Sequence, residues 1–352
     1  MLGHEKRVAV GMSGGVDSSV AALILKEQGF EVVGLTLALC GNGPPPGVGD
    51  AKKVAEHIGI EHHVLDLRGI FRKKVTDYFV REYQNGATPN PCAVCNREIK
   101  FGAMLDAAGK LSAGRLATGH YAAVEFNEKS GRYMLRKSPC GKDQSYFLAL
   151  LRQDQLKAAM FPLAGMSKDA VREIAVLGGL PVAHKPDSQE ICFIPDNNYV
   201  QFIREYTGVP PKEGDFVDAG GHVIGRHMGI VCYTVGQRKG LGAFGRPMFV
   251  TGINAAENTV ILGEGTEQNA GGFIAEDMNW IAFDRPPSEF TAEVKIRFRA
   301  RPAKAVVYAH EDGMVEVRFD EPQRAVTPGQ IAALYDGENL LGGGRIREGI
   351  RL

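Results

Sequence analysis

Residues 11–19, Gly-Met-Ser-Gly-Gly-Val-Asp-Ser-Ser, decide the fold of this chain, because they join a short apolar strand pattern (KRVAVG, residues 6–11) to a helical pattern at residues 17–28. Glycines let backbone N–H groups approach phosphate oxygens, hydroxyls add donors, and a helix N-terminus adds partial positive charge. The segment lacks both the Gly-Lys-Ser/Thr ending of a Walker A loop and the G-x-G-x-x-G spacing of a dinucleotide fold. A glycine-rich turn with a Ser or Asp N-cap is the structural alternative. The strand–turn–helix context favours a phosphate loop.

The rest of the first two hundred residues alternates strand and helix patterns. The strands are predicted at residues 6–11, 31–38, 61–67 and 116–121, and the helices at residues 17–28, 50–58, 69–84 and 92–108. The strands are nearly continuous apolar runs, which is typical of sheets that are buried on both faces. The repeated β–α units therefore predict an α/β fold with a doubly wound parallel sheet.

The pattern changes near Thr207, where short strands separated by Gly, Pro and Asp-Gly turns take over. Such strands are typical of small β-barrel modules. We therefore expect a nucleotide-binding catalytic domain over residues 1–206, a central β domain over 207–270 and a C-terminal β-barrel over 271–352.

The composition is that of a globular protein, since 44% of the 352 residues are hydrophobic and 23% are charged. No apolar run approaches the roughly 20 residues that cross a bilayer. The N-terminal residues lack a signal-peptide core, so we expect a cytoplasmic protein without a membrane partner. The 41 basic residues balance 41 acidic ones, which argues against non-specific coating of nucleic acid but allows a local basic surface for one folded RNA. We expect no DNA partner.

Six cysteines are too few and too scattered for a disulfide scaffold. Cys92 and Cys95 follow two prolines in TPNPCAVCN, in the first turn of a predicted helix, where the helix end is expected to lower the thiol pKa. Cys192 lies far away in KPDSQEICF. Core packing, a zinc half-site and a redox pair are the alternatives for C-x-x-C, although no second C-x-x-C or H-x-x-x-H completes a zinc site. We interpret the other three cysteines as packing or surface residues: Cys40, Cys140 and Cys232.

Several of these segments resemble known families. SGGVDSS resembles the phosphate loop of the ATP pyrophosphatases, which cleave ATP between its α- and β-phosphates. Six motifs then occur in the order found in the bacterial tRNA-specific 2-thiouridylase family (the MnmA family): SGGVDSS, TPNPCxxCN with EIKF, ATGHY, KDQSYFL, DSQEICFI and GQRKGLG. The similarity extends to VTPGQ (residues 326–330) and GGG (residues 342–344), so it spans essentially the whole chain.

This resemblance implies an enzyme that uses ATP with Mg²⁺ to adenylate the C2 oxygen of the wobble uridine in tRNA. Sulfur then displaces AMP, which divides a difficult substitution into two easier ones. Asp17 would hold Mg²⁺ or fix the loop. The residues that the resemblance implies for ATP binding are Gly11, Met12, Ser13, Gly14, Gly15, Val16, Asp17, Ser18, Leu37 and Gly119.

The same resemblance implies roles for the cysteines and for RNA contacts. Cys192 would carry a persulfide received from a sulfur-relay protein or a cysteine desulfurase, and Cys95 would assist sulfur release and end in a disulfide with Cys192. The remaining implied contacts are Asn90, Pro91 and Cys92 with the flipped-out target base, and Lys142, Asp143, Gln144, Arg297 and Phe298 with the anticodon region of tRNA.

The residues themselves add a hint in the barrel, which the resemblance makes a tRNA-binding domain. Lys295, Arg297, Arg299 and Arg301 alternate, so in a strand they would share one face and form a basic stripe suited to phosphates. A solvated strand edge guarded by charges is the alternative.

The chain departs from the family pattern at Cys92, where better-studied members have Asp. Cys92, Cys95 and Cys192 could instead hold a [4Fe–4S] cluster with one open iron, a rival route to the same product. The loop around Pro44 is also shorter than the acidic insertion common in the family.

Two other classes of protein compete as interpretations: a phosphate-loop amide ligase that adenylates a carboxylate, and a non-catalytic RNA-binding scaffold. The first needs no paired cysteines or RNA-binding barrel, and the intact SGGVDSS argues against the second.

Overall fold

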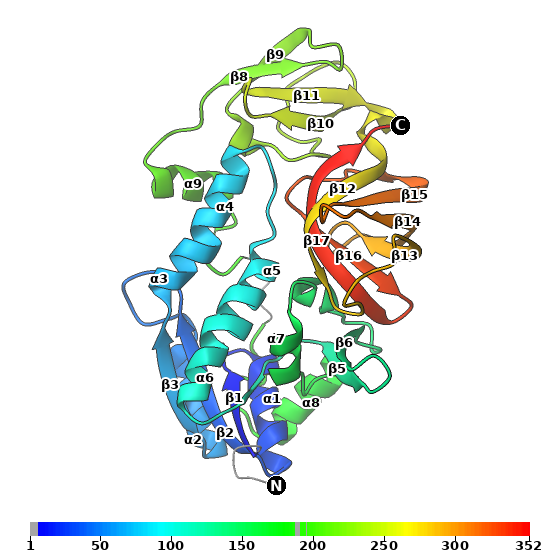
Figure 1. The fold of residues 1–352 in the computed structure, drawn as a ribbon. Helices are drawn as coiled ribbons and strands as arrows, with labels where there is room; N and C mark the ends of the chain where they lie inside the picture. The colour runs from blue at the N-terminus through cyan, green and yellow to red at the C-terminus, as the bar shows by residue number, and fades with distance from the viewer. Residues whose placement is uncertain (1–5, 187–190, 195) are drawn as a thin grey trace. The chain divides into compact units, whose positions relative to one another are not determined.

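Five parallel strands form the sheet that carries residues 11–19 in this computed structural model, which describes residues 6–186, 191–194 and 196–352 (Figure 1). The order is β3-β2-β1-β4-β7, and every neighbouring pair is parallel. The strands are β1 (Arg7–Gly11), β2 (Glu31–Ala38), β3 (Glu61–Asp66), β4 (Arg115–Ala117) and β7 (Ala159–Met160). The predicted doubly wound parallel sheet is confirmed. Its core is made by apolar side chains of β1 and of the helices that pack on it.

Helices connect these strands and continue beyond them. They are α1 (Val16–Glu27), α2 (Val48–Ile58), α3 (Arg68–Phe71), α4 (Asp77–Gln84), α5 (Pro91–Cys95), α6 (Leu105–Lys110), α7 (Gln153–Ala158), α8 (Lys168–Leu177) and α9 (Tyr199–Thr207). Short 3-10 turns are η4 (Ser145–Leu148), η5 (Ile230–Cys232) and η6 (Gly265–Gln268).

Two of the predicted helices contain a wider π-helical segment. The helix predicted at residues 69–84 consists of α3, η2 (Arg72–Thr76) and α4, and that predicted at 92–108 consists of α5, η3 (Asn96–Met104) and α6. Such segments are frequent at functional sites. The second one follows Cys95 directly, so the backbone geometry changes where the paired cysteines end.

The strand predicted at residues 116–121 is too long, because β4 ends at Ala117. The next residues leave the sheet and pass beside the start of α1. A hairpin of β5 (Ala122–Asn127) and β6 (Arg132–Lys137), which was not predicted, follows and pairs with Asn339 and Leu340.

The chain divides into two units that are described separately. The first contains Met1–Val75, Cys92–Gln189 and Glu338–Leu340, and the second contains Thr76–Pro91, Glu190–Gly337 and Leu341–Leu352. Each unit is therefore built from stretches that are distant in sequence.

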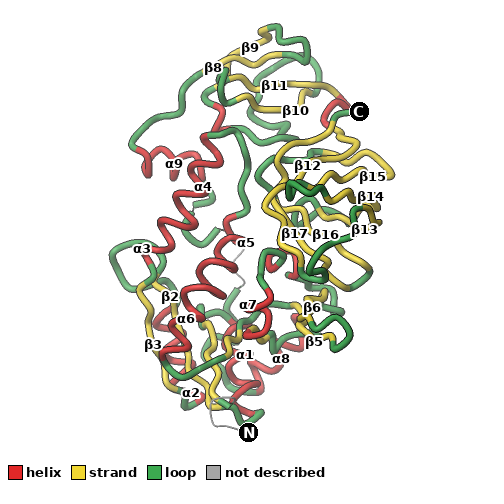
Figure 2. The backbone as a smooth tube through the Cα atoms, in the orientation of Figure 1, coloured by secondary structure: helices red, strands yellow, loops and turns green. Residues whose placement is uncertain are grey.

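The second unit contains two β structures, as the change of pattern near Thr207 predicted (Figure 2). The smaller sheet has the order β10-β11-β8-β9, and the larger structure is a six-stranded barrel of order β12-β15-β14-β13-β16-β17 that the β12–β17 pairing closes. The strands are β8 (Gly214–Val217), β9 (Val223–His227), β10 (Met248–Asn254), β11 (Thr259–Glu264), β12 (Asn269–Trp280), β13 (Glu289–Lys295), β14 (Ala303–Ala309), β15 (Val315–Arg324), β16 (Ile331–Asp336) and β17 (Asn339–Ile350). The division at residues 206 and 270 stays a prediction.

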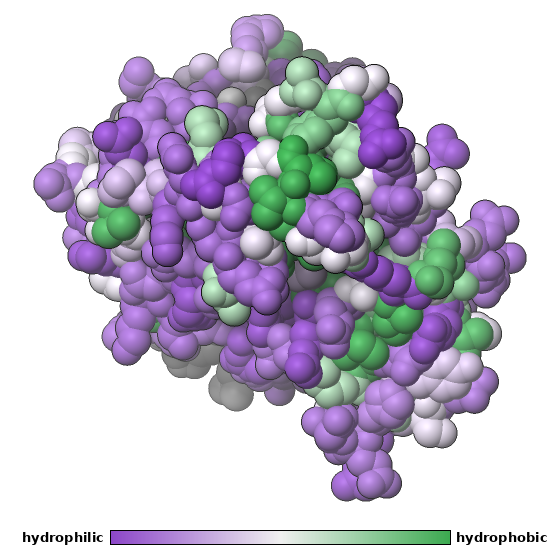
Figure 3. All heavy atoms as spheres, turned by 90° about the horizontal axis from the view of Figure 1, so that it is seen from above, coloured by the Kyte–Doolittle hydropathy of each residue, from purple (hydrophilic) through white to green (hydrophobic). Residues whose placement is uncertain are grey.

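The surface is mostly polar in the view of Figure 3, where hydrophobic residues appear in small groups among hydrophilic ones. Within the described part of the chain, no helix is long and apolar enough to cross a membrane.

Candidate functional site

The phosphate-loop candidate lies between the last residue of β1, Gly11, and the first residue of α1, Val16. Its serines fold back on the loop. The Ser18 hydroxyl accepts from Ser13 N at 3.2 Å and donates to Gly15 O at 3.2 Å. The Ser19 hydroxyl donates to the same carbonyl at 2.8 Å. These bonds hold the loop at the carboxyl end of the sheet, where ligands bind in open α/β folds.

Gly14 is required by a close backbone approach. It has a φ of +72°, and a Cβ there would lie 2.2 Å from the carbonyl oxygen of Gly47. Gly47 has a φ of +74°, and its own Cβ would lie 2.3 Å from Ser13 O. The Gly/Pro loop after β2 therefore packs directly on the phosphate loop. Gly47 is not predictable from the sequence, because one glycine among several in CGNGPPPGVG gives no local sign of its partner.

Gly119 also allows two backbones to meet, since a Cβ there would lie 2.8 Å from Asp17 C and from Ser18 N. Leu37 lies farther along β2, partly buried and opposite Leu65 of β3. Both residues lie at the same sheet edge as the loop. Their predicted contact with ATP stays a prediction.

Asp17 is the centre of a charged cluster. One carboxylate oxygen contacts Lys168 Nζ at 2.6 Å and accepts from the Tyr121 hydroxyl at 2.8 Å, and the other contacts Lys142 Nζ at 3.2 Å. The Lys142 ammonium also lies 4.4 Å from the centre of the Tyr121 ring, within cation–π range. Two ammonium groups thus surround a single carboxylate beside the loop.

Lys185 adds a third ammonium group beside the phosphate loop. Its Nζ donates to the Gly14 carbonyl at 2.9 Å and pairs with Asp50 at 2.7 Å. This hydrogen bond and charge lower the pKa of the Asp50 carboxyl. Lys168 and Lys185 are not predictable as site residues, because each is a single lysine far from the loop in sequence.

The segment predicted to contact tRNA, residues 142–144, makes internal contacts in the first unit. Asp143 accepts from Ser145 N at 3.0 Å and from the Ser145 hydroxyl at 3.0 Å. Gln144 and Tyr121 exchange two hydrogen bonds, of 2.8 Å and 3.1 Å. The segment therefore braces the tyrosine that contacts Asp17. Its contact with tRNA stays a prediction.

The proline-rich loop before the paired cysteines is held within the second unit. Thr88 N donates to Pro328 O at 2.8 Å, and the Gln330 side chain donates to Thr88 O at 2.9 Å and to Pro89 O at 3.3 Å. Gly329 has a φ of +90°, and a Cβ there would lie 2.9 Å from Thr88 backbone atoms. The VTPGQ segment thus fixes the backbone that leads to α5.

Asn90 and Pro91 are buried at the start of α5, Cys92 is exposed and Cys95 is buried. The surroundings of Cys92 oppose the effect that was expected of the helix end. Partial desolvation of its sulfur raises the pKa of Cys92, and the positive charge of Lys100 opposes this only in part. A five-residue helix that passes directly into a π segment supplies little compensating charge at its N-terminus.

Cys192 is exposed, whereas the next residue, Phe193, is buried. The Phe193 ring packs edge-on against Phe79 of α4, with centroids 5.4 Å apart, and against Phe202 of α9 at 5.3 Å. An aromatic cluster of the second unit therefore anchors the segment that presents Cys192.

The three cysteines are divided between the units: Cys92 and Cys95 belong to the first and Cys192 to the second. Their convergence on one base stays a prediction. The remaining residues of the DSQE part of that motif, 187–190, lie outside the described residues, as does residue 195. Among the residues that the structure describes, no group of three or more His, Cys, Asp or Glu side chains is arranged to hold a metal ion.

The predicted basic stripe in the barrel is wrong as a strand face. β13 ends at Lys295, and the chain then turns, with Ala300 N donating to Arg297 O at 3.1 Å. The Arg297 guanidinium folds back onto the carbonyls of Arg324 and Ala325, both at 3.2 Å. Phe298 is 37% exposed, with Lys295 Nζ 5.6 Å from its ring centre. The tRNA contacts of Arg297 and Phe298 stay predictions.

Family models match three consecutive parts of the chain. They are described as a tRNA methyl transferase HUP domain at residues 6–196, a tRNA methyl transferase PRC-barrel domain at 200–264 and an aminomethyltransferase beta-barrel domain at 270–346. The first of them alone covers more than half of the chain.

Curated relatives match nearly the whole chain. A protein of Desulfitobacterium hafniense strain Y51 named tRNA-specific 2-thiouridylase MnmA is 49% identical, over 98% of this chain and 99% of its own. A protein of Caldanaerobacter subterraneus subsp. tengcongensis named tRNA-specific 2-thiouridylase MnmA 2 is 48% identical, with the same coverage. Among solved structures, NMN synthetase from Francisella tularensis aligns with a TM-score of 0.35 and 18% identity, over 58% of this chain and 77% of that one. On the strength of the full-length relatives, the chain belongs to the tRNA-specific 2-thiouridylase (MnmA) family.

Proposed function

We propose that this protein is a tRNA-uridine 2-sulfurtransferase, which converts the wobble uridine of tRNA to 2-thiouridine and consumes ATP to give AMP and pyrophosphate. The observation that carries the proposal is the identity of 44–49% over nearly the full length with relatives named as 2-thiouridylases. The loop of residues 11–19 supports it, because its glycines and helix N-terminus suit a phosphate group.

In the first step the uracil O2 attacks the α-phosphorus of ATP, and the bond to the pyrophosphate oxygen breaks. Negative charge builds on the departing pyrophosphate. The ammonium groups of Lys142, Lys168 and Lys185 lie around the loop and suit this charge. Bound Mg²⁺ would neutralise phosphate charge, and the Asp17 carboxylate beside the loop is an oxygen ligand of the kind that it prefers.

In the second step the terminal sulfur of a Cys192 persulfide attacks C2, and AMP leaves. The Cys95 thiolate then attacks the Cys192 sulfur and breaks the S–S bond, which releases 2-thiouridine and leaves a Cys95–Cys192 disulfide for a thiol reductant to reopen. The exposure of Cys192 supports loading by a sulfur-relay protein or a cysteine desulfurase. Iron and sulfide analysis after anaerobic purification separates this route from the iron–sulfur rival. About four irons bound to the wild-type protein and lost in Cys92→Ala would overturn the persulfide route.

We assign the chemistry to residues 1–206 and tRNA binding to the barrel at residues 271–352, with residues 207–270 between them. Asn90, Pro91 and Cys92 are assigned to the target base. The rigid hold on Thr88 and Pro89 supports this, because a base reader must keep its shape. The proposed site of action is the cytoplasm, where tRNA and ATP are available.

The test is tRNA-stimulated conversion of ATP to AMP, together with mass spectrometry of wobble uridines from cells that lack the protein. Asp17→Asn should abolish both turnover and thiolation, whereas Asp154→Asn, an exposed ion-paired carboxylate of the same unit, should leave them unchanged. ADP as product would overturn the proposal. Turnover without RNA would favour the amide ligase alternative.

A further inference from the structure

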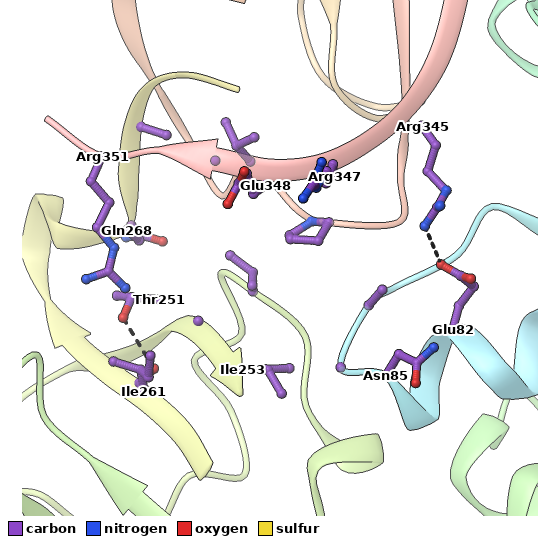
Figure 4. A pocket seen from close by; sticks show the side chains of 18 of the residues that line it. Glu82, Asn85, Thr251, Ile253, Ile261, Gln268, Arg345, Arg347, Glu348 and Arg351 are labelled. Atoms are coloured by element: carbon purple, nitrogen blue, oxygen red, sulfur yellow. Dashed lines mark hydrogen bonds and ion pairs between the residues drawn. The ribbon is translucent and has the colours of Figure 1, made fainter. Parts of the chain in front are cut away.

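A cavity of about 690 Å³ lies within the second unit, and its lining contains neither a phosphate-loop residue nor a cysteine. It is formed by the C-terminal end of α4, by β10 and β11, and by the last residues of β17 (Figure 4). Its volume is in the range of pockets that hold small organic ligands. No step of the proposed reaction uses it.

Arginines of β17 and of the residue after it give this cavity its character. Arg345, Arg347 and Arg351 all line it, and Figure 4 shows Arg345 reaching Glu82 while Arg351 reaches toward Thr251 and Ile261. The pairing of β17 with β12 shifts its register between Ile346 and Glu348, so Arg347 lies at a β-bulge. The three guanidinium groups therefore reach the cavity from positions before, at and after this bulge.

Only the first of these arginines is neutralised. Arg345 pairs with Glu82 at 3.1 Å and with Glu276 at 2.5 Å. Arg347 and Arg351 are exposed and form no ion pair with any residue that the structure describes. Two planar, bidentate donors are thus left for an anion such as phosphate.

The lining next to these two arginines includes the Glu348 carboxylate as well as apolar groups. Gly349 lies between the two unpaired arginines in sequence, and a Cβ there would meet Ala270 and Val326 only at 3.7 Å. Ile253 and Ile261 line the facing side. Apolar side chains opposite unpaired guanidinium groups suit a nucleobase attached to its phosphate.

We propose that this cavity holds one unpaired nucleotide of the RNA substrate, with its phosphates on Arg347 and Arg351 and its base against Ile253 and Ile261. The proposal rests on the proposed function, since that function supplies the RNA. It adds a second point of attachment for tRNA, separate from the target base.

The test measures equilibrium binding of full-length substrate tRNA to the intact protein over a range of salt concentrations. In the double variant Arg347→Gln/Arg351→Gln, the slope of log K against log salt should fall by about 1.4 if two single-strand phosphate contacts are lost. Affinity at moderate salt should fall about tenfold. Arg226→Gln is the matched control, because it removes an exposed arginine of the same unit that is already paired with Asp215.

A second variant tests the space without changing charge. Asn85 is exposed at the cavity and its side chain makes no hydrogen bond with the described residues, so Asn85→Trp should fill the entrance and weaken tRNA binding with the protein still folded. If both variants keep the wild-type affinity for tRNA and the wild-type salt slope, and the wild-type protein binds and thiolates tRNA, the nucleotide proposal for the cavity is overturned. The proposed function is then left intact. Binding of free UMP that the variants lose, with tRNA binding unchanged, would also overturn it. Wild-type protein that binds no tRNA would overturn both proposals.

Discussion

Several charged side chains surround the phosphate loop, and their positions there cannot be predicted from the sequence. Asp17 is held by Lys168 and Lys142, and Lys185 holds the loop backbone through Gly14 O. These lysines come from different parts of the first unit, and only folding brings their ammonium groups together. These individual side chains therefore set the balance of charge at the proposed ATP site.

Lys168 offers a direct test of this charge balance. Lys168→Met removes an ammonium group that lies 2.6 Å from Asp17, so the KM for ATP should rise about tenfold, a loss of about 1.4 kcal/mol of binding. Steady-state release of pyrophosphate measures it. Lys168→Arg should restore most of the affinity, and a KM that stays at the wild-type value in the Met variant would contradict the role.

Cys92 should react with alkylating reagents only at higher pH than an ordinary exposed cysteine. Desolvation raises its pKa, so less thiolate exists at neutral pH, and thiolate is the reactive form. Lys100→Met should move the midpoint still higher, because it removes the charge that lowers the pKa. Peptide mapping after iodoacetamide treatment across pH measures the midpoint. A midpoint below the usual cysteine range would show that the helix end dominates.

Close backbone contacts between loops determine the shape of the phosphate loop and of the proline-rich loop before Cys92. The loop after β2 presses on the phosphate loop through Gly47, and the VTPGQ segment presses on Thr88 through Gly329. In each case the glycine has a positive φ as well as a neighbour too close for a Cβ. A side chain at either position would push two functional loops apart.

Gly47→Ala should therefore damage the proposed ATP site. The left-handed backbone alone costs about 1–2 kcal/mol for a residue with a Cβ, and the contact with Ser13 O adds to this. We expect a loss of at least about 2 kcal/mol in the free energy of unfolding and weaker ATP binding, measured by denaturant titration and calorimetry. Gly43→Ala is the control in the same loop, since a Cβ there meets nothing within 4 Å.

The aromatic cluster around Phe193 should govern sulfur transfer rather than adenylation. Phe193→Ala removes a buried ring that joins the Cys192 segment to α4 and α9, at a cost of about 3 kcal/mol in unfolding free energy. Formation of AMP should then exceed formation of 2-thiouridine, which the two products measured in one assay would show. Phe193→Leu should keep them nearly equal. Equal losses of both products in the Ala variant would mean that the ring acts only through stability.

At the scale of the whole molecule, each unit is assembled from separate stretches of chain, and buried charges connect them. In the second unit, Glu82 of α4 is only 8% exposed at its side chain and pairs with Arg345 of β17. Burial alone would lower the pKa of Arg345, but the carboxylates of Glu82 and Glu276 more than offset this and raise it. The pair therefore joins residues that are 263 positions apart.

Arg345→Met should uncouple α4 from the barrel, because it removes the closer of the two arginines that pair with the buried Glu82 carboxylate and leaves only Arg81 at 4.0 Å. Breaking one partner of a buried pair costs about 3–5 kcal/mol. Hydrogen exchange should become faster in α4 and β17, while β1 and β2 of the first unit keep their protection. Arg318→Met, which removes an exposed arginine of the same barrel, should change neither region.

The sequence alone determined the kind of structure, because local patterns carry that information. Apolar runs at residues 31–38 and the loop at residues 11–19 predicted the parallel sheet and its phosphate loop, and the turn-rich second half predicted the β structures. The motifs were also sufficient to identify the family. Each of these signals lies within a few neighbouring residues, where period and turn chemistry act directly.

Folding brings together side chains that are distant in the sequence. It placed Lys168 and Lys185 at the loop, turned the chain after Lys295 so that no basic strand face forms there, and raised the pKa of Cys92 where a helix end was expected to lower it. Burial, ion pairing and the space open to a Cβ are set by neighbours that the chain meets after folding. A local pattern holds no record of those neighbours, which is why these features could not be read from the sequence.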